Sequence, residues 1–62
     1  MKSLNVKPNI DKPDDFYASL LMAHDGLSKE ESEAFNARLI LILANHVGDS
    51  DVLAEALRAA AR

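Results

Sequence analysis

The stretch that decides the fold is SKEESEAFNARLILILANHVG, residues 28–48. It opens with Ser28 followed three residues later by Glu31, which is the capping-box pattern of a helix start, and it closes on Gly48, a common helix stop. The sequence therefore predicts a helix over residues 28–47, a little under about 30 Å long at 1.5 Å per residue.

The second half of this central helix is apolar on nearly every side. On a wheel of 100° per residue, only Arg38 and Asn45 define a polar stripe, and that stripe is narrow. The large apolar side chains that fill the rest are Phe35, Leu39, Ile40, Leu41, Ile42 and Leu43. A helix with this pattern is buried on more than one side.

Two shorter helices are predicted to flank the central one. The first spans about residues 12–25, with Asp11 as its N-cap and Gly26 ending it in a Schellman-type turn. The other spans about residues 50–61, with Asp49 or Asp51 as its cap. Its inner face is predicted to consist of Val52, Leu53, Ala56, Leu57 and Ala60. Short connections fold successive helices back on each other.

Residues 1–10 show a different pattern. Leu4, Val6 and Ile10 alternate with polar residues, which indicates an extended segment, and Pro8 keeps that segment out of a sheet interior. We expect an arm that lays these apolar side chains on a helical surface of its own chain or of a neighbour; a frayed tail is the alternative. The predicted fold is all-α, a small three-helix bundle (residues 11–62) with an extended N-terminal arm (residues 1–10).

The length of 62 residues leaves room for one domain. A chain of this size buries about 5,900 Å² when it folds compactly, which makes a monomer marginally stable. It contains no cysteine, so a disulfide cannot reinforce it. If the flanking helices each cover one side of the central helix, the third side stays exposed. We therefore expect a homo-oligomer or a larger partner protein; the alternative is that the short helices and the arm cover the central helix in a monomer.

The residues expected at such an interface are large apolar side chains and two polar anchors on or near the central helix. They are Tyr17, Phe35, Arg38, Leu39, Ile40, Leu41, Ile42 and Asn45, together with Leu4 and Val6 of the arm. Tyr17 can equally pack in the core, and Arg38 can equally extend to water or pair with an acid. Substitution of Ile40 or Leu41 by glutamate is expected to break association, or to unfold the chain if the residue is core.

Charge and composition exclude several classes of protein. The net charge is −3 and no basic cluster is present, which disfavours nucleic-acid binding and attachment to an anionic membrane. A helix-turn-helix reading is disfavoured too, because Asp49, Asp51 and Glu55 would face phosphate. The longest apolar run, residues 39–44, is far too short to cross a bilayer. No secretory signal is recognisable, and a cytoplasmic location is expected.

Catalytic chemistry has little support in the sequence. His24 and His46 lack the spacing of a zinc site, and each lies in the last turn of a predicted helix, where histidine suits the free carbonyls. No phosphate-binding loop or nucleophile motif is present. We therefore expect no metal, no cofactor and no enzyme activity by this chain alone. An open alternative is a ligand-binding or catalytic site formed between chains around Arg38, Asn45 and His46.

Several short pieces of the sequence resemble a small bacterial helical family of unknown function. They include Pro13-Asp14-Asp15-Phe16-Tyr17, Asn36-Ala37-Arg38-Leu39 and Leu43-Ala44-Asn45-His46 followed by Gly48-Asp49. Some members are encoded near flavin-dependent aromatic monooxygenases, so the resemblance implies that a flavoenzyme is a possible partner. The family carries no assigned catalytic residues. The function expected is a non-catalytic interaction module that self-associates or serves as a small accessory subunit of a larger enzyme.

Overall fold

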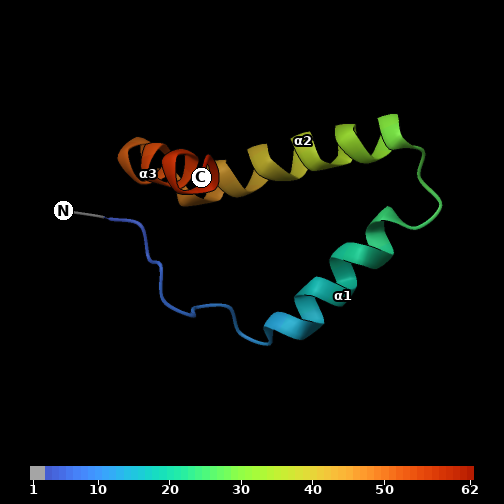
Figure 1. Cartoon of the computed structure of the whole chain (residues 1–62), viewed down its shortest axis with the longest axis horizontal. Coiled ribbons are helices and arrows are strands. Elements are labelled where there is room, and N and C mark those ends of the chain that lie inside the picture. The colour runs from blue at the N-terminus through green and yellow to red at the C-terminus, as the bar shows by residue number, and fades with distance from the viewer. Residues whose placement is uncertain (1–2) are drawn as a thin grey trace.

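The computed structural model describes residues 3–62 and contains three helices in that range. They are α1 (Pro13–His24), α2 (Lys29–Val47) and α3 (Ser50–Ala60), and no strand occurs among the described residues. Figure 1 shows the three helices in chain order, with the N-terminal segment running back below α2 toward α3. The predicted all-α, three-helix fold is confirmed.

Both ends of α2 follow the sequence signals. The Ser28 hydroxyl accepts a hydrogen bond from the Glu31 amide at 3.1 Å, and the Glu31 carboxylate accepts one from the Ser28 amide at 2.9 Å. Gly48 takes a positive φ of 76°, and its amide donates to the Ala44 carbonyl at 2.9 Å. The predicted capping box and glycine stop are confirmed, so α2 is set by local chemistry at both ends.

The start of α1 differs from the prediction that Asp11 caps it. The N-cap position belongs to Lys12, which has a left-handed backbone (φ 57°, ψ 63°), and no side chain caps the helix. Pro13 occupies the first turn, and a proline disfavours right-handed helical backbone in the residue before it. The proline therefore prevents α1 from extending toward the N-terminus beyond Pro13. The prediction that Asp11 caps the helix was wrong.

The end of α1 is a type II β-turn rather than the Schellman ending predicted from Gly26. Asp25 has φ −63° and ψ 130°, Gly26 has φ 79°, and the Leu27 amide donates to the His24 carbonyl at 3.1 Å. These are the angles of a type II turn, which needs glycine at its third position. The positive φ of Gly26 was foreseen, but the motif was not.

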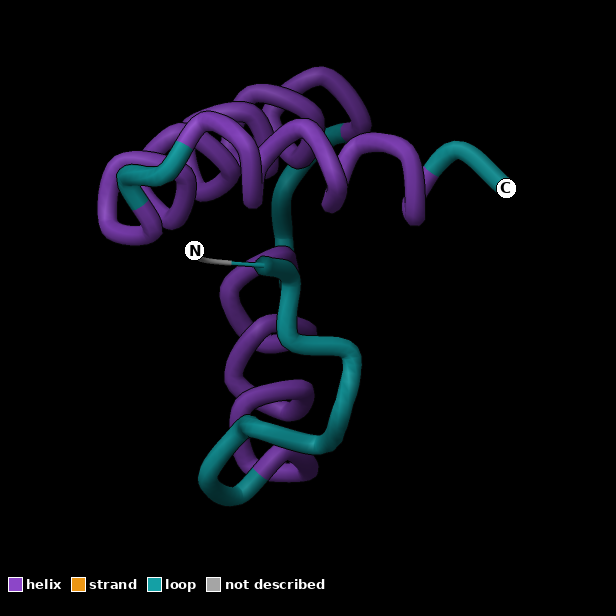
Figure 2. Tube along the Cα trace, turned by 90° about the vertical axis from the view of Figure 1, so that its left-hand side faces the viewer, coloured by secondary structure: helices purple, strands orange, loops and turns teal. Residues whose placement is uncertain are grey.

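The cap of α3 matches one of the predicted candidates. The Asp49 carboxylate accepts hydrogen bonds from the amides of Asp51 at 2.9 Å and Val52 at 3.1 Å. Since α2 ends at Val47, the connection to α3 is short. Figure 1 views α3 nearly end-on while α2 lies across the picture, and Figure 2 shows α3 along its length. The two helices therefore cross steeply at the C-terminal end of α2.

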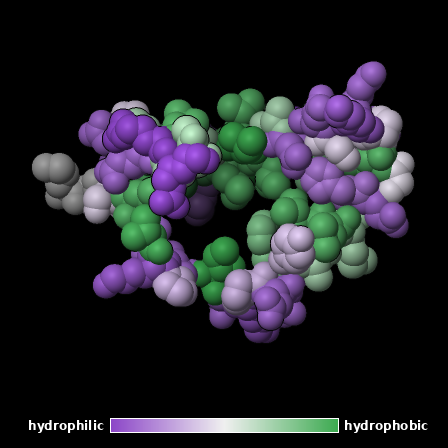
Figure 3. All heavy atoms as spheres, in the orientation of Figure 1, coloured by the Kyte–Doolittle hydropathy of each residue, from purple (hydrophilic) through white to green (hydrophobic). Residues whose placement is uncertain are grey.

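The arrangement of the three helices is open. α1 diverges from α2 beyond the turn at residues 25–28 (Figure 1), so the expectation that it covers one side of the central helix was wrong. The radius of gyration is 13.4 Å, against about 10.6 Å for a compact domain of this length. No residue in the described range is buried. Figure 3 shows an opening in the middle of the molecule, bordered largely by hydrophobic residues.

The N-terminal arm contacts the helices at Leu4. Residues 3–12 form neither helix nor strand, and the Leu4 amide donates to the Glu55 carboxylate of α3 at 3.3 Å. Leu4 is half-buried, whereas Val6 is 82% exposed and Ile10 is exposed as well. The expectation that Val6 and Ile10 lie on a helical surface of their own chain was therefore wrong. The first two residues of the predicted arm lie outside the described range.

Candidate interaction surface

An apolar groove lies between the C-terminal half of α2 and α3. It has a volume of about 530 Å³ and is open to solvent along one side. Its lining is wholly aliphatic: Ile40, Leu43, Ala44 and Val47 from α2, with Leu53, Ala56, Leu57 and Ala60 from α3. We call this feature the α2–α3 groove. It offers shape and apolar area, but no polar group that would orient a small polar ligand.

The groove follows from two helical repeats and the steep crossing. Ile40, Ala44 and Val47 recur at intervals of four and three, so they form one stripe on α2. Leu53 and Leu57 recur in the same way on α3. Because the helices cross steeply at the short connection, these stripes face each other near the crossing and separate away from it. Leu57 was predicted to be covered, yet it is 73% exposed, because α1 does not reach it.

The exposed surface of the chain is large for its mass. It measures 5730 Å², whereas a compact 6.8 kDa monomer exposes about 3,950 Å². The excess is about 1,800 Å². The large hydrophobic residues that are exposed are Val6, Ile10, Phe16, Tyr17, Leu21, Met22, Leu27, Ile40, Leu41, Ile42, Leu43, Val47 and Leu57.

The interface candidates on α2 divide between the groove and the outer side of the helix. Ile40 is 63% exposed and lines the groove. Leu41 is 69% exposed. On a helical wheel it lies about 110° from the centre of the groove-lining face of α2. Ile42 is exposed on the outer side as well, whereas Leu39 is half-buried. These neighbours of equal chemistry but different placement offer a matched comparison.

The polar candidates do not form one cluster. Arg38 and Asn45 are exposed and share a face of α2, because seven residues make nearly two turns. His46 is also exposed, but it lies about 90° from that face. The structure thus brings Arg38 and Asn45 together and separates them from His46.

The helix α1 presents an apolar arc of its own. Phe16, Leu20, Tyr17 and Leu21 fall within about 140° on a helical wheel, and Leu20 is the one half-buried member. Tyr17, an interface candidate that was equally expected to pack in the core, is exposed. Met22 lies on the opposite side of α1.

His24 joins α1 to the polar first half of α2. One ring nitrogen, Nδ1, lies 3.0 Å from the Ser32 hydroxyl, and the other, Nε2, lies 3.0 Å from Oδ1 of Asn36. With Nε2 protonated, the ring donates to Asn36 and can accept from Ser32. The Phe35 ring meets it edge-on with centroids 4.9 Å apart. We call His24, Ser32, Phe35 and Asn36 the hinge cluster.

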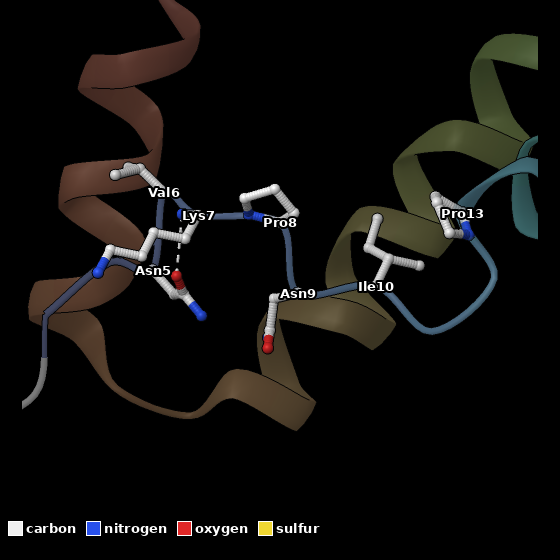
Figure 4. Close-up of a pocket in the computed structure, with 7 residues that line it drawn as sticks. All are labelled: Asn5, Val6, Lys7, Pro8, Asn9, Ile10 and Pro13. Atoms are coloured by element: carbon white, nitrogen blue, oxygen red, sulfur yellow. Dashed lines mark hydrogen bonds between the residues drawn. The ribbon is translucent and has the colours of Figure 1, made fainter.

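A second hollow lies along the N-terminal arm. It measures about 550 Å³ and is formed by one bend of the chain, as Figure 4 shows. Its lining residues are Asn5, Val6, Lys7, Pro8, Asn9, Ile10 and Pro13. The Asn5 side chain accepts a hydrogen bond from the Lys7 amide at 3.0 Å, which holds the bend. The hollow brings together no residues from different helices, so it provides no assembled binding chemistry.

The chemistry of the described residues is sparse. Within residues 3–62, no group of three or more His, Cys, Asp or Glu side chains is placed to hold a metal ion. None of the helices in that range combines the length and the hydrophobicity needed to cross a bilayer. The features that the structure assembles are therefore apolar surfaces and the hinge cluster.

Sequence reasoning missed the two features that organise these surfaces. His24 was read as a partner for the end of its own helix, and nothing in the local pattern linked it to Ser32 and Asn36. The groove was missed because the stripe on α3 was assigned to the interior, while Ile40 was considered as an interface candidate on α2 alone. The spacing of Ile40, Ala44 and Val47 was the signal that could have revealed it.

Comparisons with known proteins find one family that matches the chain. No curated protein and no solved structure matches the chain. One family does match, over residues 4–62, and it is described as a protein of unknown function (DUF2783). The match covers the arm and all three helices, and on that basis the chain belongs to the DUF2783 family.

Proposed function

We propose that this protein is a non-catalytic interaction module that completes its hydrophobic core only against another chain. The observation that carries the proposal is that no described residue is buried, while the α2–α3 groove presents eight aliphatic residues to solvent. Monomeric soluble proteins seldom expose apolar patches of more than a few hundred Å² unless these serve an interaction. The side-chain caps of α2 and α3 show that these two helices are well specified, so the open groove between them belongs to folded elements.

Two kinds of partner fit this role: a second copy of the chain, or a larger enzyme that it serves as an accessory subunit. The resemblance noted from the sequence makes a flavin-dependent aromatic monooxygenase the first enzyme to test. Net charge of −3 and the absence of a basic cluster support a protein partner rather than nucleic acid.

Light scattering over a concentration series, with and without that enzyme, tests the proposal. Two variants sharpen it: Ile40→Glu places a charge in the groove, and Leu41→Glu places the same charge on the outer side of α2. We expect Ile40→Glu to abolish association and Leu41→Glu to weaken it less, because only the first charge enters the groove. A wild-type chain that remains a stable monomer with no partner refutes the proposal.

A ligand site between chains is the second candidate, favoured by the shared exposed face of Arg38 and Asn45. An arginine beside an amide suits a carboxylate or phosphate, since the guanidinium binds such groups through two parallel hydrogen bonds. Melting temperatures of the wild-type and Arg38→Ala chains, measured with phosphate and with small dicarboxylates, test it. If the added anions shift the melting temperatures of the wild-type and Arg38→Ala chains equally, the result counts against this candidate.

A further inference from the structure

We propose that the occupant of the α2–α3 groove is the α1 helix of a second copy of this chain, exchanged reciprocally in a two-fold symmetric homodimer. This inference rests on the proposed interaction function and names its partner. In such a dimer each chain supplies one groove and one helix, so the same contact occurs twice.

The first argument is reach. α1 has 12 residues, which gives it a length of about 17 Å. If it folded back along α2 from the turn at residues 25–28, it would extend to about the level of Ile40. The groove begins there and continues to Val47 and to Ala60 on α3. A chain therefore cannot fill its own groove with α1.

The second argument is that the arm does not fill the groove either. Its contact with α3 is the hydrogen bond from Leu4 to Glu55. On a helical wheel Glu55 lies about 150° from the centre of the groove-lining face of α3. The arm therefore lies against the opposite side of that helix, and Val6 remains exposed.

The third argument is area. The chain exposes about 1,800 Å² more than a compact monomer of its mass. Two copies that bury this excess form an interface of about 3,600 Å², within the range of about 2,000–5,000 Å² typical of obligate homodimers. One additional copy thus supplies the missing burial.

The fourth argument is complementarity between α1 and the groove. The apolar arc on α1 joins two aromatic and two leucine side chains (Phe16, Tyr17, Leu20 and Leu21), whereas the groove is purely aliphatic. Three aspartates (Asp11, Asp14 and Asp15) lie at the start of α1 against one lysine, Lys12, whereas Arg58 lies in the last turn of α3 and Arg62 just beyond it. This charge pattern places the start of the incoming α1 near the end of α3.

Cysteine pairing tests the exchange directly, because the natural chain contains no cysteine. Leu21→Cys places a thiol on the apolar arc of α1, and Leu57→Cys places one in the groove. The two single variants are mixed, unfolded, refolded together and mildly oxidised. We expect the mixed disulfide to form at least about tenfold faster than with Met22→Cys, whose thiol lies on the far side of α1.

The outcomes separate this inference from the proposed function. A dimer in light scattering with equal pairing of the Leu21 and Met22 variants overturns the exchange but leaves the interaction module standing. Binding only to another protein, or a monomer in which a chain carrying both thiols closes on itself, also overturns it. A stable monomer with no partner overturns both proposals.

A measurement on the unmodified chain guards against variants that fail to fold. Isotope-labelled and unlabelled chains are mixed, and NMR contacts are recorded only between the two kinds. We expect contacts from the Phe16 and Tyr17 rings of one copy to the Leu57 and Val47 methyl groups of the other. Their absence in a sample that scatters light as a dimer overturns the inference.

Discussion

The substitution Leu57→Ala distinguishes two hypotheses: that the α2–α3 groove stays open, and that a partner fills it. In the single chain Leu57 is 73% exposed. Fully burying a leucine is worth about 1.5–3 kcal/mol, so the quarter that is covered contributes about 0.4–0.8 kcal/mol. Alanine is also the better helix former. If nothing fills the groove, Leu57→Ala changes the free energy of unfolding by less than about 1 kcal/mol.

A filled groove changes the expected magnitude. Removing a buried leucine side chain costs about 2–5 kcal/mol, and a symmetric dimer loses two. The total of at least about 4 kcal/mol raises the dissociation constant by a factor of at least about 700, since 1.4 kcal/mol is a factor of ten.

Sedimentation equilibrium measures the dissociation constant and urea unfolding measures the stability of the Leu57→Ala chain. Leu41→Ala is the matched control, because Leu41 is 69% exposed but lies outside the groove. Equal effects of the two substitutions would refute the assignment of the interface to the groove.

Three further substitutions test the local structure. His24→Ala removes two side-chain hydrogen bonds and an aromatic contact, and should lower the free energy of unfolding by about 1–3 kcal/mol; urea titration checks this, with Asn36→Ala losing less because it breaks one of those bonds. Ser28→Ala removes half of the capping box and should cost about 1 kcal/mol, seen as lower helicity in circular dichroism, whereas Ser50→Ala should change little. Gly48→Ala should cost about 1–2 kcal/mol because φ is +76° while the added Cβ meets nothing nearer than 3.7 Å; an unchanged melting temperature would contradict this.

The sequence predicted those parts of the fold that depend on neighbouring residues. Ser28 with Glu31, Gly48 and Asp49 each satisfy or end backbone hydrogen bonding within a few residues, so the ends of α2 and the start of α3 were readable. The start of α1 was not. Its N-cap residue, Lys12, has a left-handed backbone that L residues seldom adopt, and no local pattern indicates it.

The relation between helices could not be predicted for a different reason. The position of α1 depends on His24 meeting Ser32 and Asn36, which lie 8 and 12 residues away. The wheel of α2 predicted burial on more than one side, which was wrong for the single chain, because no residue of α2 is buried. The wheel could not show which face of α2 stays exposed. The direction in which α3 crosses α2 decides how much of the stripe of Ile40, Ala44 and Val47 is left uncovered.

The energetics of the chain differ between the two halves of α2. The first half holds α1 through two side-chain hydrogen bonds and one aromatic contact of the hinge cluster, worth about 1–3 kcal/mol together. The second half carries aliphatic side chains of the α2–α3 groove, of which Ile40 is 63% exposed and Val47 is 45% exposed. Burying one such side chain fully is worth about 1.5–3 kcal/mol, so several of them in a filled groove contribute more than the hinge cluster. If the groove is filled as proposed, α1 is therefore the element expected to leave the hinge cluster and reorient when the partner binds.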